Sequence, residues 1–593
     1  MNTTQKALAD GHSLAPFYPK GVRWDLDIPQ IDLTRVLDEA IVKFSDRPVI
    51  DFMGKKITYI ELGHLIAKAA KGLQDMGVKS GSKVGLYMPN TPYYPIMFFA
   101  ALRLGATVVN FSPLYTKEEL RAQIRDSGTD VMVTLDLKDF QQKARALLDE
   151  GELKNIISCN LAGMLPPIKA FAYTFFKHHD IAPLSNDNRN KNFYDLIQND
   201  GYYKPITVDP QSIAVLQYTG GTTGVPKGAI LSHYNLVANS CQIEEFYMAS
   251  PNKPNELGIL RPGKERVLAA IPYFHVFGMT VSMIASMKLG GELIILPNPR
   301  DLDQAMKAIH KKKPTFFPAV PRLLQALAES PKAKHYDFSS LNSVFSGGAA
   351  LQPNIRDNFE KAVGRAGIIK QGYGLTETSP VASSNPAYGM NKPESVGLSY
   401  PRTMIKIAHP DDPEQTLNIG DVGEILIKGP QVMGGYYNKP SETAEVLTQD
   451  GWFRTGDLGK LDENYYLHIV DRKKRLIIIN GFNVYPNVVE QALSKHPSVA
   501  ECVVISIPDE RSGEAAKAFI RYKAGESAPT DAEWRSFLTD KLNRIEMPKH
   551  IETIEQEILK TAVGKPDWKK IQDAERIKYE QKKNSNQPKP PAA

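Results

Sequence analysis

Apolar residues in the first half of the chain recur at spacings that alternate between helix and strand. The clearest helical stripe has an apolar side chain at every third or fourth position, at Leu62, Ile66, Ala69, Leu73 and Met76. Gly77 directly after it is a helix stop signal. The next apolar residues alternate instead, at Val84, Leu86 and Met88, as they do in a strand.

This alternation continues along the chain. Thr116 and Glu119 have the spacing of a capping box, which predicts a helix start, and residues 130–135 predict a strand. Later apolar runs predict further strands at Val267–Ile271, Glu292–Leu296, Thr315–Ala319 and Ser343–Phe345. The pattern indicates an α/β fold with a largely parallel, buried sheet, whose ligands bind at the carboxyl ends of the strands.

The pattern changes near Thr403 to short strands with close turns, and changes again after Arg472. We therefore expect a large N-terminal domain over residues 1–473, in which residues 403–470 form a β-rich, barrel-like subdomain. A small, mobile α+β domain is expected over residues 475–575, hinged at Lys474. Residues 576–593 are polar and predict a disordered tail.

Composition narrows the class of protein. The 593 residues are 42% hydrophobic and 23% charged, which is a normal globular balance. The formal net charge of +6 is too dilute over this length to indicate nucleic-acid binding. Three widely separated cysteines favour a reducing compartment, and neither a secretory signal nor a membrane-spanning run is present in the sequence.

The segment Leu161–Asn190 allows two interpretations. Large apolar residues, Phe171, Phe175 and Phe176 among them, sit beside lysines and the pair His178–His179. An amphipathic helix at a membrane interface would have this composition. An insertion packed on the body of the protein explains the same residues.

A glycine- and threonine-rich segment follows the strand-like run 214–217. It reads Tyr218-Thr-Gly-Gly-Thr-Thr-Gly-Val-Pro-Lys-Gly228. Backbone N–H groups at a strand-to-helix turn form an anion nest suited to a polyphosphate, and Lys227 adds a positive charge. The segment is not a Walker A loop, because Pro226 precedes the lysine and Gly228 follows it. A flexible surface loop is the competing interpretation, and so ordered a series of residues argues against it.

This segment resembles the phosphate-binding signature of the adenylate-forming superfamily, which includes acyl-CoA synthetases, luciferases and peptide-synthetase adenylation domains. The resemblance runs from about Trp24 to Lys565. Further motifs follow in the family's order, at Pro272–Gly278, Ser346–Ala350, Gln371–Glu377, Gly451–Asp457 and Val470–Lys474. Ile479–Pro486, with Gly429–Met433 upstream, is most similar to bacterial long-chain fatty acid–CoA ligases.

The resemblance implies a nucleotide site that binds ATP with Mg²⁺. Phosphate contacts are expected from Tyr218, Thr219, Gly220, Gly221, Thr222, Thr223, Gly224 and Lys227. Glu377 is the expected magnesium ligand, together with Thr223, because hard cations take oxygen ligands. The adenine is expected beside Gly348, Ala349, Gln371, Gly372, Tyr373 and Thr376, and the ribose at Asp457 and Arg472.

Lys565 and His275 complete the implied catalytic set with Glu377. Lys565 would bridge the acid's carboxylate and the α-phosphate, although Pro566–Lys569 after it departs from the family's pattern. His275 would lie near the same centre, where its apolar neighbours suit the wall of an acyl channel. We do not expect it to be a general base, since a carboxylate or thiolate nucleophile needs little help with deprotonation.

The family separates two half-reactions by rotating its small domain. Lys474 matches the hinge. The first pose would deliver Lys565, and the second would bring Gly481 and Phe482 to line a tunnel for coenzyme A. Lys565→Ala is then expected to abolish adenylation while thiolysis of supplied acyl-adenylate stays measurable.

The sequence therefore predicts a cytoplasmic ligase that makes acyl-CoA from a long-chain fatty acid, ATP and CoA, with acyl-adenylate as intermediate. Peripheral contact with the inner face of the membrane and a homodimer remain open. A ligase for medium-chain or aryl acids, a luciferase-type oxygenase and a non-catalytic acyl or nucleotide sensor are the alternatives. No nucleic-acid partner is expected.

Overall fold

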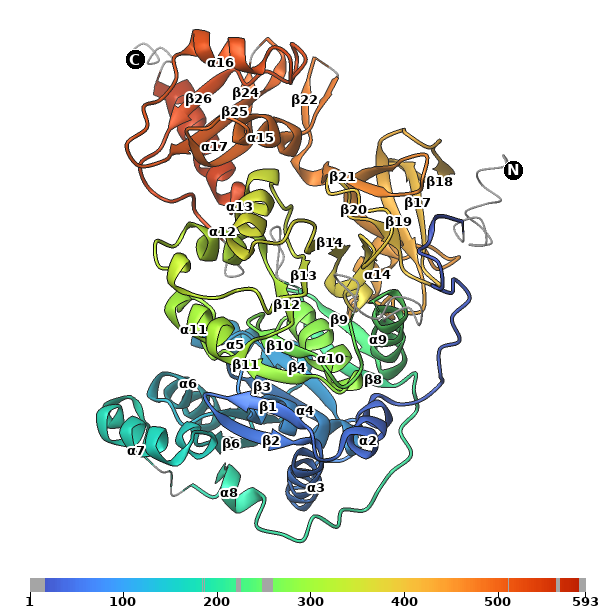
Figure 1. The fold of residues 1–593 in the computed structure, drawn as a ribbon, viewed down its shortest axis with the longest axis vertical. Coiled ribbons are helices and arrows are strands. Elements are labelled where there is room, and N and C mark those ends of the chain that lie inside the picture. Colours follow the sequence, from blue (N-terminus) through green and yellow to red (C-terminus); the bar gives the residue numbers. More distant parts are fainter. Residues whose placement is uncertain are drawn as a thin grey trace, which may run out of the picture.

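The computed structural model describes residues 16–183, 185, 187–219, 226–247, 260–480, 482–509, 511–560 and 566–585. Two large sheets with flanking helices form the body of the molecule, and an antiparallel sheet and a small domain follow along the chain (Figure 1). Among the described residues, no helix is both long and apolar enough to cross a membrane.

The first large sheet has seven strands. In spatial order these are β7 (Asn190–Asn192), β6 (Asn155–Cys159), β5 (Val131–Leu135), β3 (Lys83–Tyr87), β4 (Thr107–Phe111), β8 (Ile213–Tyr218) and β9 (Gly228–Ser232). The strands from β7 to β8 pair in parallel, and β9 pairs antiparallel with β8. Every residue of β4 and β5 is buried, as expected for a central parallel strand.

The second large sheet has nine strands. Its order is β16 (Leu398–Ser399), β15 (Val381–Ser384), β14 (Ile369–Gly374), β13 (Ser343–Ser346), β12 (Phe316–Ala319), β10 (Arg266–Ala269), β11 (Glu292–Ile295), β1 (Pro48–Phe52) and β2 (Lys55–Thr58). Its middle strands are parallel, and the carboxyl ends of β13 and β14 lead into two of the predicted nucleotide motifs.

Helices cover both sheets. They are α2 (Leu33–Phe44), α3 (Tyr59–Asp75), α4 (Tyr93–Arg103), α5 (Lys117–Ser127), α6 (Lys138–Asp149), α7 (Pro167–Phe176), α8 (Phe193–Leu196), α9 (His233–Tyr247), α10 (Ser286–Lys288), α11 (Leu302–Lys312), α12 (Pro321–Glu329) and α13 (Pro353–Val363). Helix α4 is apolar all round and almost wholly buried, which identifies it as a core helix. A π-helix over Gly278–Ala285 is equally buried.

A five-stranded antiparallel sheet completes the large domain. Its order is β18 (Asp412–Thr416), β17 (Met404–His409), β19 (Gly423–Lys428), β20 (Phe453–Leu461) and β21 (Leu467–Arg472), and α14 (Pro440–Val446) lies between β19 and β20 in the chain. This sheet occupies the part of the sequence where short strands were predicted.

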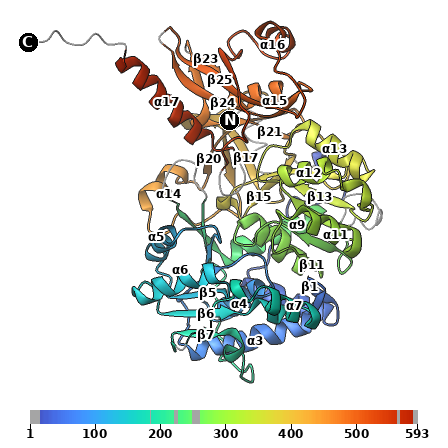
Figure 2. The ribbon, with the colours of Figure 1, turned by 90° about the vertical axis from the view of Figure 1, so that its left-hand side faces the viewer.

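A separate small domain begins after β21 (Figure 2). Its sheet contains β23 (Phe482–Val484), β22 (Ile477–Ile479), β25 (Gly513–Tyr522) and β24 (Val499–Asp509), with β26 (His550–Thr553) on β25. The helices α15 (Pro486–Ser494), α16 (Asp531–Leu538) and α17 (Trp568–Ser585) pack around it. The change of sheet falls between Arg472 and Ile477, at the segment that contains Lys474.

The α/β class with a large N-terminal and a small C-terminal domain is confirmed. The capping box of Thr116 and Glu119 is present at the start of α5, and the stripe ending at Met76 forms α3. The disordered tail is wrong for residues 576–585, because α17 runs to Ser585. The charged residues and Gln there have high helix propensity, which outweighs their lack of apolar side chains. Residues 586–593 lie outside the described part of the chain.

Candidate functional site

The predicted nucleotide loop joins two paired strands. Tyr218 at the end of β8 pairs with Gly228 at the start of β9, and Thr219 N–H donates to Lys227 O at 2.9 Å. The expectation of a strand-to-helix turn is therefore wrong, since α9 begins only at His233 after β9 has paired back on β8. The interior of the loop, 220–225, is outside the described residues, so its anion nest stays a prediction.

Lys227, Tyr436 and Glu377 form a connected group beside this hairpin. The Lys227 Nζ lies 5.1 Å from the centre of the Tyr436 ring, a cation–π distance. The Tyr436 hydroxyl donates to Glu377 Oε1 at 2.7 Å. Backbone bonds hold the group together, because Ile230 N–H donates to Gly435 O and Met433 N–H to Glu377 O. Lys227 of the loop and Glu377 of the second motif thus both contact Tyr436.

The protonation of the Glu377 carboxyl is subject to opposing influences. Burial raises its pKa, while the hydrogen bond from Tyr436 and the charge of Arg472 act in the opposite direction. Within the described residues, no three His, Cys, Asp or Glu side chains gather as a metal site. A lone carboxylate fits a magnesium ion that keeps water and phosphate oxygens as its other ligands.

Asp457 on β20 is held from two sides. Its Oδ1 lies 3.0 Å from Arg472 Nε, and its Oδ2 accepts from the Tyr373 hydroxyl at 2.7 Å. Asp457 and Arg472 are directly opposite each other in the β20–β21 pairing, so the sheet register sets their contact. The carboxylate raises the pKa of Arg472 above its ordinary value. Each Asp457 oxygen keeps a lone pair for a further donor such as a ribose hydroxyl.

The expected adenine-side residues lie on the loop after β13, on β14 itself and on the turn that follows it. Gly348 has φ +81° and, like Ala349, is exposed. A Cβ on Gly372 would lie 2.4 Å from the Phe345 ring, so this close approach requires glycine. The side-chain amide of Gln371 is hydrogen-bonded within the protein, since its Oε1 accepts from Leu351 N–H and its Nε2 donates to Ser395 O. Thr376 begins the short 3₁₀ turn that also carries Glu377.

His275 lies between β10 and the π-helix on a loop with several internal anchors. Its Nδ1 accepts from Phe277 N–H at 3.3 Å, which places the proton of the neutral ring on Nε2. Gln217 at the end of β8 donates to Phe274 O at 2.8 Å, and Asn90 accepts from Tyr273 N–H at 2.7 Å. The histidine loop, which follows β10 of the nine-stranded sheet, is thus pinned to the seven-stranded sheet.

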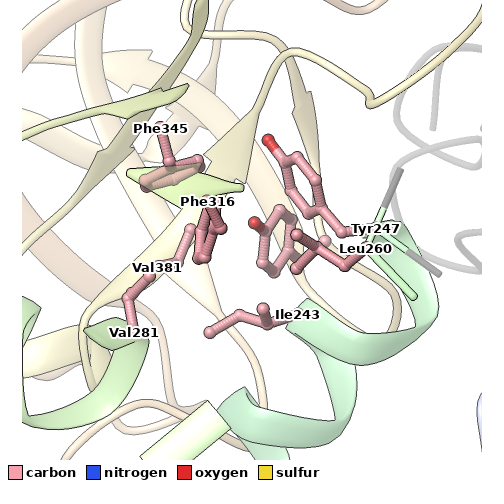
Figure 3. Close-up of a pocket in the computed structure, with 8 residues that line it drawn as sticks. Ile243, Tyr247, Leu260, Val281, Phe316, Phe345 and Val381 are labelled. Carbon is pink, nitrogen blue, oxygen red and sulfur yellow. The ribbon is translucent and has the colours of Figure 1, made fainter. Parts of the chain in front are cut away.

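An apolar cavity lies beneath these loops (Figure 3). Its lining comes from α9, the π-helix, strands of the nine-stranded sheet and the adjoining loops: Ile243, Tyr247, Leu260, Val281, Phe316, Phe345, Val381 and Tyr400. Phe345 lies between this cavity and the Gly372 backbone, since its ring is the nearest neighbour of a Cβ built on that glycine. The cavity therefore adjoins the predicted adenine loop.

The hinge segment joins the two domains through Asp471. Its Oδ2 accepts from Asn487 N–H at 2.5 Å, at the start of α15, and its Oδ1 accepts from Arg472 N–H at 2.7 Å. Burial raises the pKa of Asp471 to about 6. Arg475 lies 3.9 Å from Asp471 and 2.5 Å from Glu490. Lys474 and Phe482 are both exposed.

The structure brings several of the predicted residues together. Lys227 and Glu377 share Tyr436, and Tyr373, Asp457 and Arg472 form one group. Seven predicted site residues lie outside the described part of the chain: Gly220, Gly221, Thr222, Thr223, Gly224, Gly481 and Lys565. The roles assigned to all these residues from the sequence stay predictions.

Sequence reasoning missed Tyr436 and the anchors Gln217 and Asn90. The signal for Tyr436 is the pair Gly434–Gly435 before it, where backbone approaches backbone closely. The signal for Gln217 and Asn90 is a polar side chain at the end of an apolar strand or just after one, which must find a partner when buried.

Comparison with known proteins covers almost the whole chain. The family described as AMP-binding enzyme matches residues 37–437, and the AMP-binding enzyme C-terminal domain matches residues 488–565. A long-chain-fatty-acid–CoA ligase of Bacillus subtilis is 38% identical over 92% of this chain and 95% of its own. One of Escherichia coli O6:H1 is 34% identical over 95% and 98%. The structure of ATP-bound MatB from Rhodopseudomonas palustris shares the fold, with a TM-score of 0.79, 24% identity, and coverage of 93% of this chain and 100% of that one.

Proposed function

The chain belongs to the AMP-binding enzyme family, and from this we propose that it is an AMP-forming long-chain fatty acid–CoA ligase. The overall reaction converts a fatty acid, ATP and CoA to acyl-CoA, AMP and pyrophosphate. The observation that carries the proposal is the chain of contacts from Lys227 through Tyr436 to Glu377, with the Asp457–Arg472 pair also near Glu377. These groups suit the phosphates and the ribose of one nucleotide.

The first half-reaction transfers the AMP group. An oxygen of the fatty-acid carboxylate attacks the α-phosphorus, the bond to the β-phosphate oxygen breaks, and pyrophosphate leaves. Such a step needs positioned positive charge more than covalent help from the protein. Lys227 supplies charge on the pyrophosphate side, Lys565 would supply it between the two reactants, and Asp457 and Arg472 orient the ribose.

Glu377 would hold magnesium on the phosphates. The ion would neutralise charge as pyrophosphate leaves. The chain's own contribution is the orientation of the carboxylate, which Tyr436 fixes through its hydroxyl. A cation beside Glu377 also favours the ionised carboxyl, opposing the effect of burial on its pKa.

The second half-reaction makes the thioester. The CoA thiolate attacks the acyl carbon, the acyl–phosphate bond breaks, and AMP leaves. We propose that rotation about Lys474 separates the two steps and brings Gly481 and Phe482 to the CoA path. The exposed side chain of Phe482 supports this assignment.

The apolar cavity is the proposed site of the acyl chain. Its lining side chains, Phe345 and Val281 among them, offer a fatty acid dispersion contacts and exclusion from water. Tyr247 hydroxyl is already bonded to Asn385 O, so its polar end adds no unsatisfied donor to the cavity. This lining matches an unsubstituted hydrocarbon chain in polarity.

Product analysis across acids tests the proposal. We expect stoichiometric AMP, pyrophosphate and acyl-CoA, with the highest kcat/KM for long-chain acids. A maximum at medium-chain or aromatic acids would contradict the proposed substrate class but leave the proposed reaction unchanged. ADP as product, or binding without turnover, would refute the ligase and in the second case support a sensor.

The proposed location is the cytoplasm, with contact to the inner face of the membrane from the aqueous side. Support comes from Cys159 and Cys241, which are free and buried thiols, as a reducing compartment allows.

A further inference from the structure

Helix α7 carries its large apolar side chains on its outer face. Ile168, Phe171, Phe175 and Phe176 are 85, 75, 64 and 75% exposed. The smaller Ala170 and the ring of Tyr173 turn inward and are half-buried. All ten residues of α7 are described, and none of them is buried. This is the reverse of a helix that packs on a soluble core, where the large apolar side chains face inward.

The exposed side chains form one continuous patch rather than scattered singles. Ile168, Phe171 and Phe175 follow the i, i+3, i+7 spacing of one helical stripe. The rings of Phe171 and Phe175 stack with centroids 6.3 Å apart, and those of Phe175 and Phe176 meet edge-on at 5.2 Å. Contiguous exposed apolar patches mark interaction surfaces, whereas single exposed residues do not.

The helix is fixed to the body of the protein. Lys169 Nζ donates to Met53 O at 2.7 Å, and Lys55 Nζ donates to Gly163 O at 2.7 Å. Both bonds join the α7 region to the β1–β2 turn. Figure 1 shows α7 at the left edge of the molecule, in the half away from the small domain. The patch is therefore held outward by the fold.

Charges around the patch are mainly positive. Residues 161–180 contain Lys169, Lys177 and the pair His178–His179, and Asp180 is their one acidic residue. The adjoining turn adds Lys55. Because Lys177 pairs with Asp180 at 3.3 Å, the positive excess comes from Lys169 and Lys55. Anionic phospholipid headgroups complement this charge, and an acyl interior complements the aromatic stripe between the lysines. A second copy of the chain fits less well, because two such faces would bring like charges together.

We propose that α7 docks this protein on an anionic lipid bilayer, with Ile168, Phe171, Phe175 and Phe176 inserted at the boundary between headgroups and acyl chains. Lys169 and Lys55, whose ammonium groups also anchor the helix through backbone oxygens, attract the lipid phosphates by their positive charge. This inference rests on the proposed contact with the membrane and names the surface that makes it. Docking needs neither ATP nor CoA, so it can be tested separately from the proposed reaction.

Vesicle flotation of the full chain tests the proposal. The probes are vesicles of phosphatidylcholine alone and of phosphatidylcholine with phosphatidylglycerol, without substrates. We expect binding to the anionic vesicles that weakens in high salt, and at least about tenfold weaker partitioning for the combined variant Phe171→Ser, Phe175→Ser and Phe176→Ser. Because these side chains are exposed, the variant should keep its fold and its activity on acids supplied free in solution.

A matched control removes exposed apolar side chains elsewhere. Val42→Ser, Tyr202→Ser and Ile577→Ser together change residues that are 83, 83 and 56% exposed, and should leave flotation unchanged. Equal loss of binding in both variants, or no binding by the wild type, would overturn the proposal. So would a wild-type dimer, measured without vesicles, that the phenylalanine variant dissociates. A wild type that binds the anionic vesicles but shows no ligase activity would instead refute the proposed function alone.

Discussion

Tyr436 links a cation and a carboxylate, so removing its hydroxyl should change the titration of Glu377. Its hydrogen bond lowers the pKa of Glu377 against the raising effect of burial. Tyr436→Phe keeps the ring under Lys227 and loses this bond. The pKa of Glu377 should then rise further, and the acid limb of the adenylation rate should move up by about half to one pH unit. The pH profile of ATP–pyrophosphate exchange measures it.

Tyr437 provides the control for this variant. It is the adjacent tyrosine, and its ring faces Lys83 at 5.4 Å rather than the site lysine. Tyr437→Phe should leave the acid limb where it is. An unshifted limb in Tyr436→Phe would mean that ionisation of Glu377 does not limit adenylation.

Asp457 should determine how well ATP binds. Asp457→Asn keeps the shape but removes the charge that pairs with Arg472 at 3.0 Å. Losing a charged hydrogen-bond partner costs about 2–3 kcal/mol, so kcat/KM for ATP should fall by about two orders of magnitude. Tyr373→Phe removes one neutral donor to the same carboxylate and should cost about fivefold. An unchanged KM for ATP in Asp457→Asn would contradict the ribose assignment.

At the residue scale, the sequence identified Glu377, Asp457 and Tyr373 as candidates, but neither Tyr436 nor the bond from Tyr373 to Asp457. Glu377 and Asp457 fall inside motifs whose order resembles a known family. Their partners Tyr436 and Tyr373 are 59 and 84 residues away in the chain, so only the folded sheets bring them together. Local spacing carries no information on such contacts.

The hinge makes a prediction at the scale of an element. Lys474 lies in the short 3₁₀ turn Lys473–Arg475, between the last strand of the large domain and the first strand of the small one. Proline fixes φ there and should restrict rotation, so Lys474→Pro should impair thioester formation and affect adenylation much less. Separate assays of the two half-reactions measure this, with Lys473→Ala as control. Equal loss of both steps would contradict the hinge.

The π-helix makes a second prediction, because Val281 on it lines the apolar cavity. Val281→Phe fills space that an acyl chain would occupy, and overpacking costs about 1–3 kcal/mol. Long-chain acids should lose about tenfold or more in kcat/KM, while short acids lose little. Val281→Ala enlarges the cavity and should retain long-chain activity. A uniform loss across chain lengths in Val281→Phe would place the acyl chain elsewhere.

Elements with local signals were predicted well, and elements set by pairing or docking were not. The capping box at Thr116 is a local hydrogen-bond pattern, so its sequence was sufficient. The loop after Tyr218 was expected to lead into a helix, but β9 returns to pair with β8. Helix α7 has apolar periodicity, yet its apolar face points outward, which periodicity alone cannot distinguish from packing inward.

The large and small domains meet at Asp471 and, away from it, at the ion pair between Arg322 and Glu557 at 3.0 Å. The Asp471 carboxyl on β21 accepts a hydrogen bond from the backbone N–H of Asn487 in α15. This bond joins the two domains, so it belongs to the domain arrangement seen here. In this arrangement burial raises the Asp471 pKa from 3.8 to about 6. If the small domain rotates as proposed, the carboxyl should return to water and to its ordinary pKa. Protonation is thus coupled to the orientation of the domains.

The sign of this coupling follows from the raised pKa. The arrangement seen here binds the proton more tightly than the rotated one, so it is most stable at low pH and loses stability as the pH rises from about 4 to 6. Between pH 5 and 7 the population of this arrangement, relative to the rotated one, should fall about tenfold. Hydrogen exchange of the Asn487 amide, corrected for its intrinsic pH dependence, should show this fall. Asp471→Asn cannot ionise and should give a flat profile, with the amide of Phe519 within the small domain as internal reference. A fall of the same size in Asp471→Asn would assign the coupling to another group.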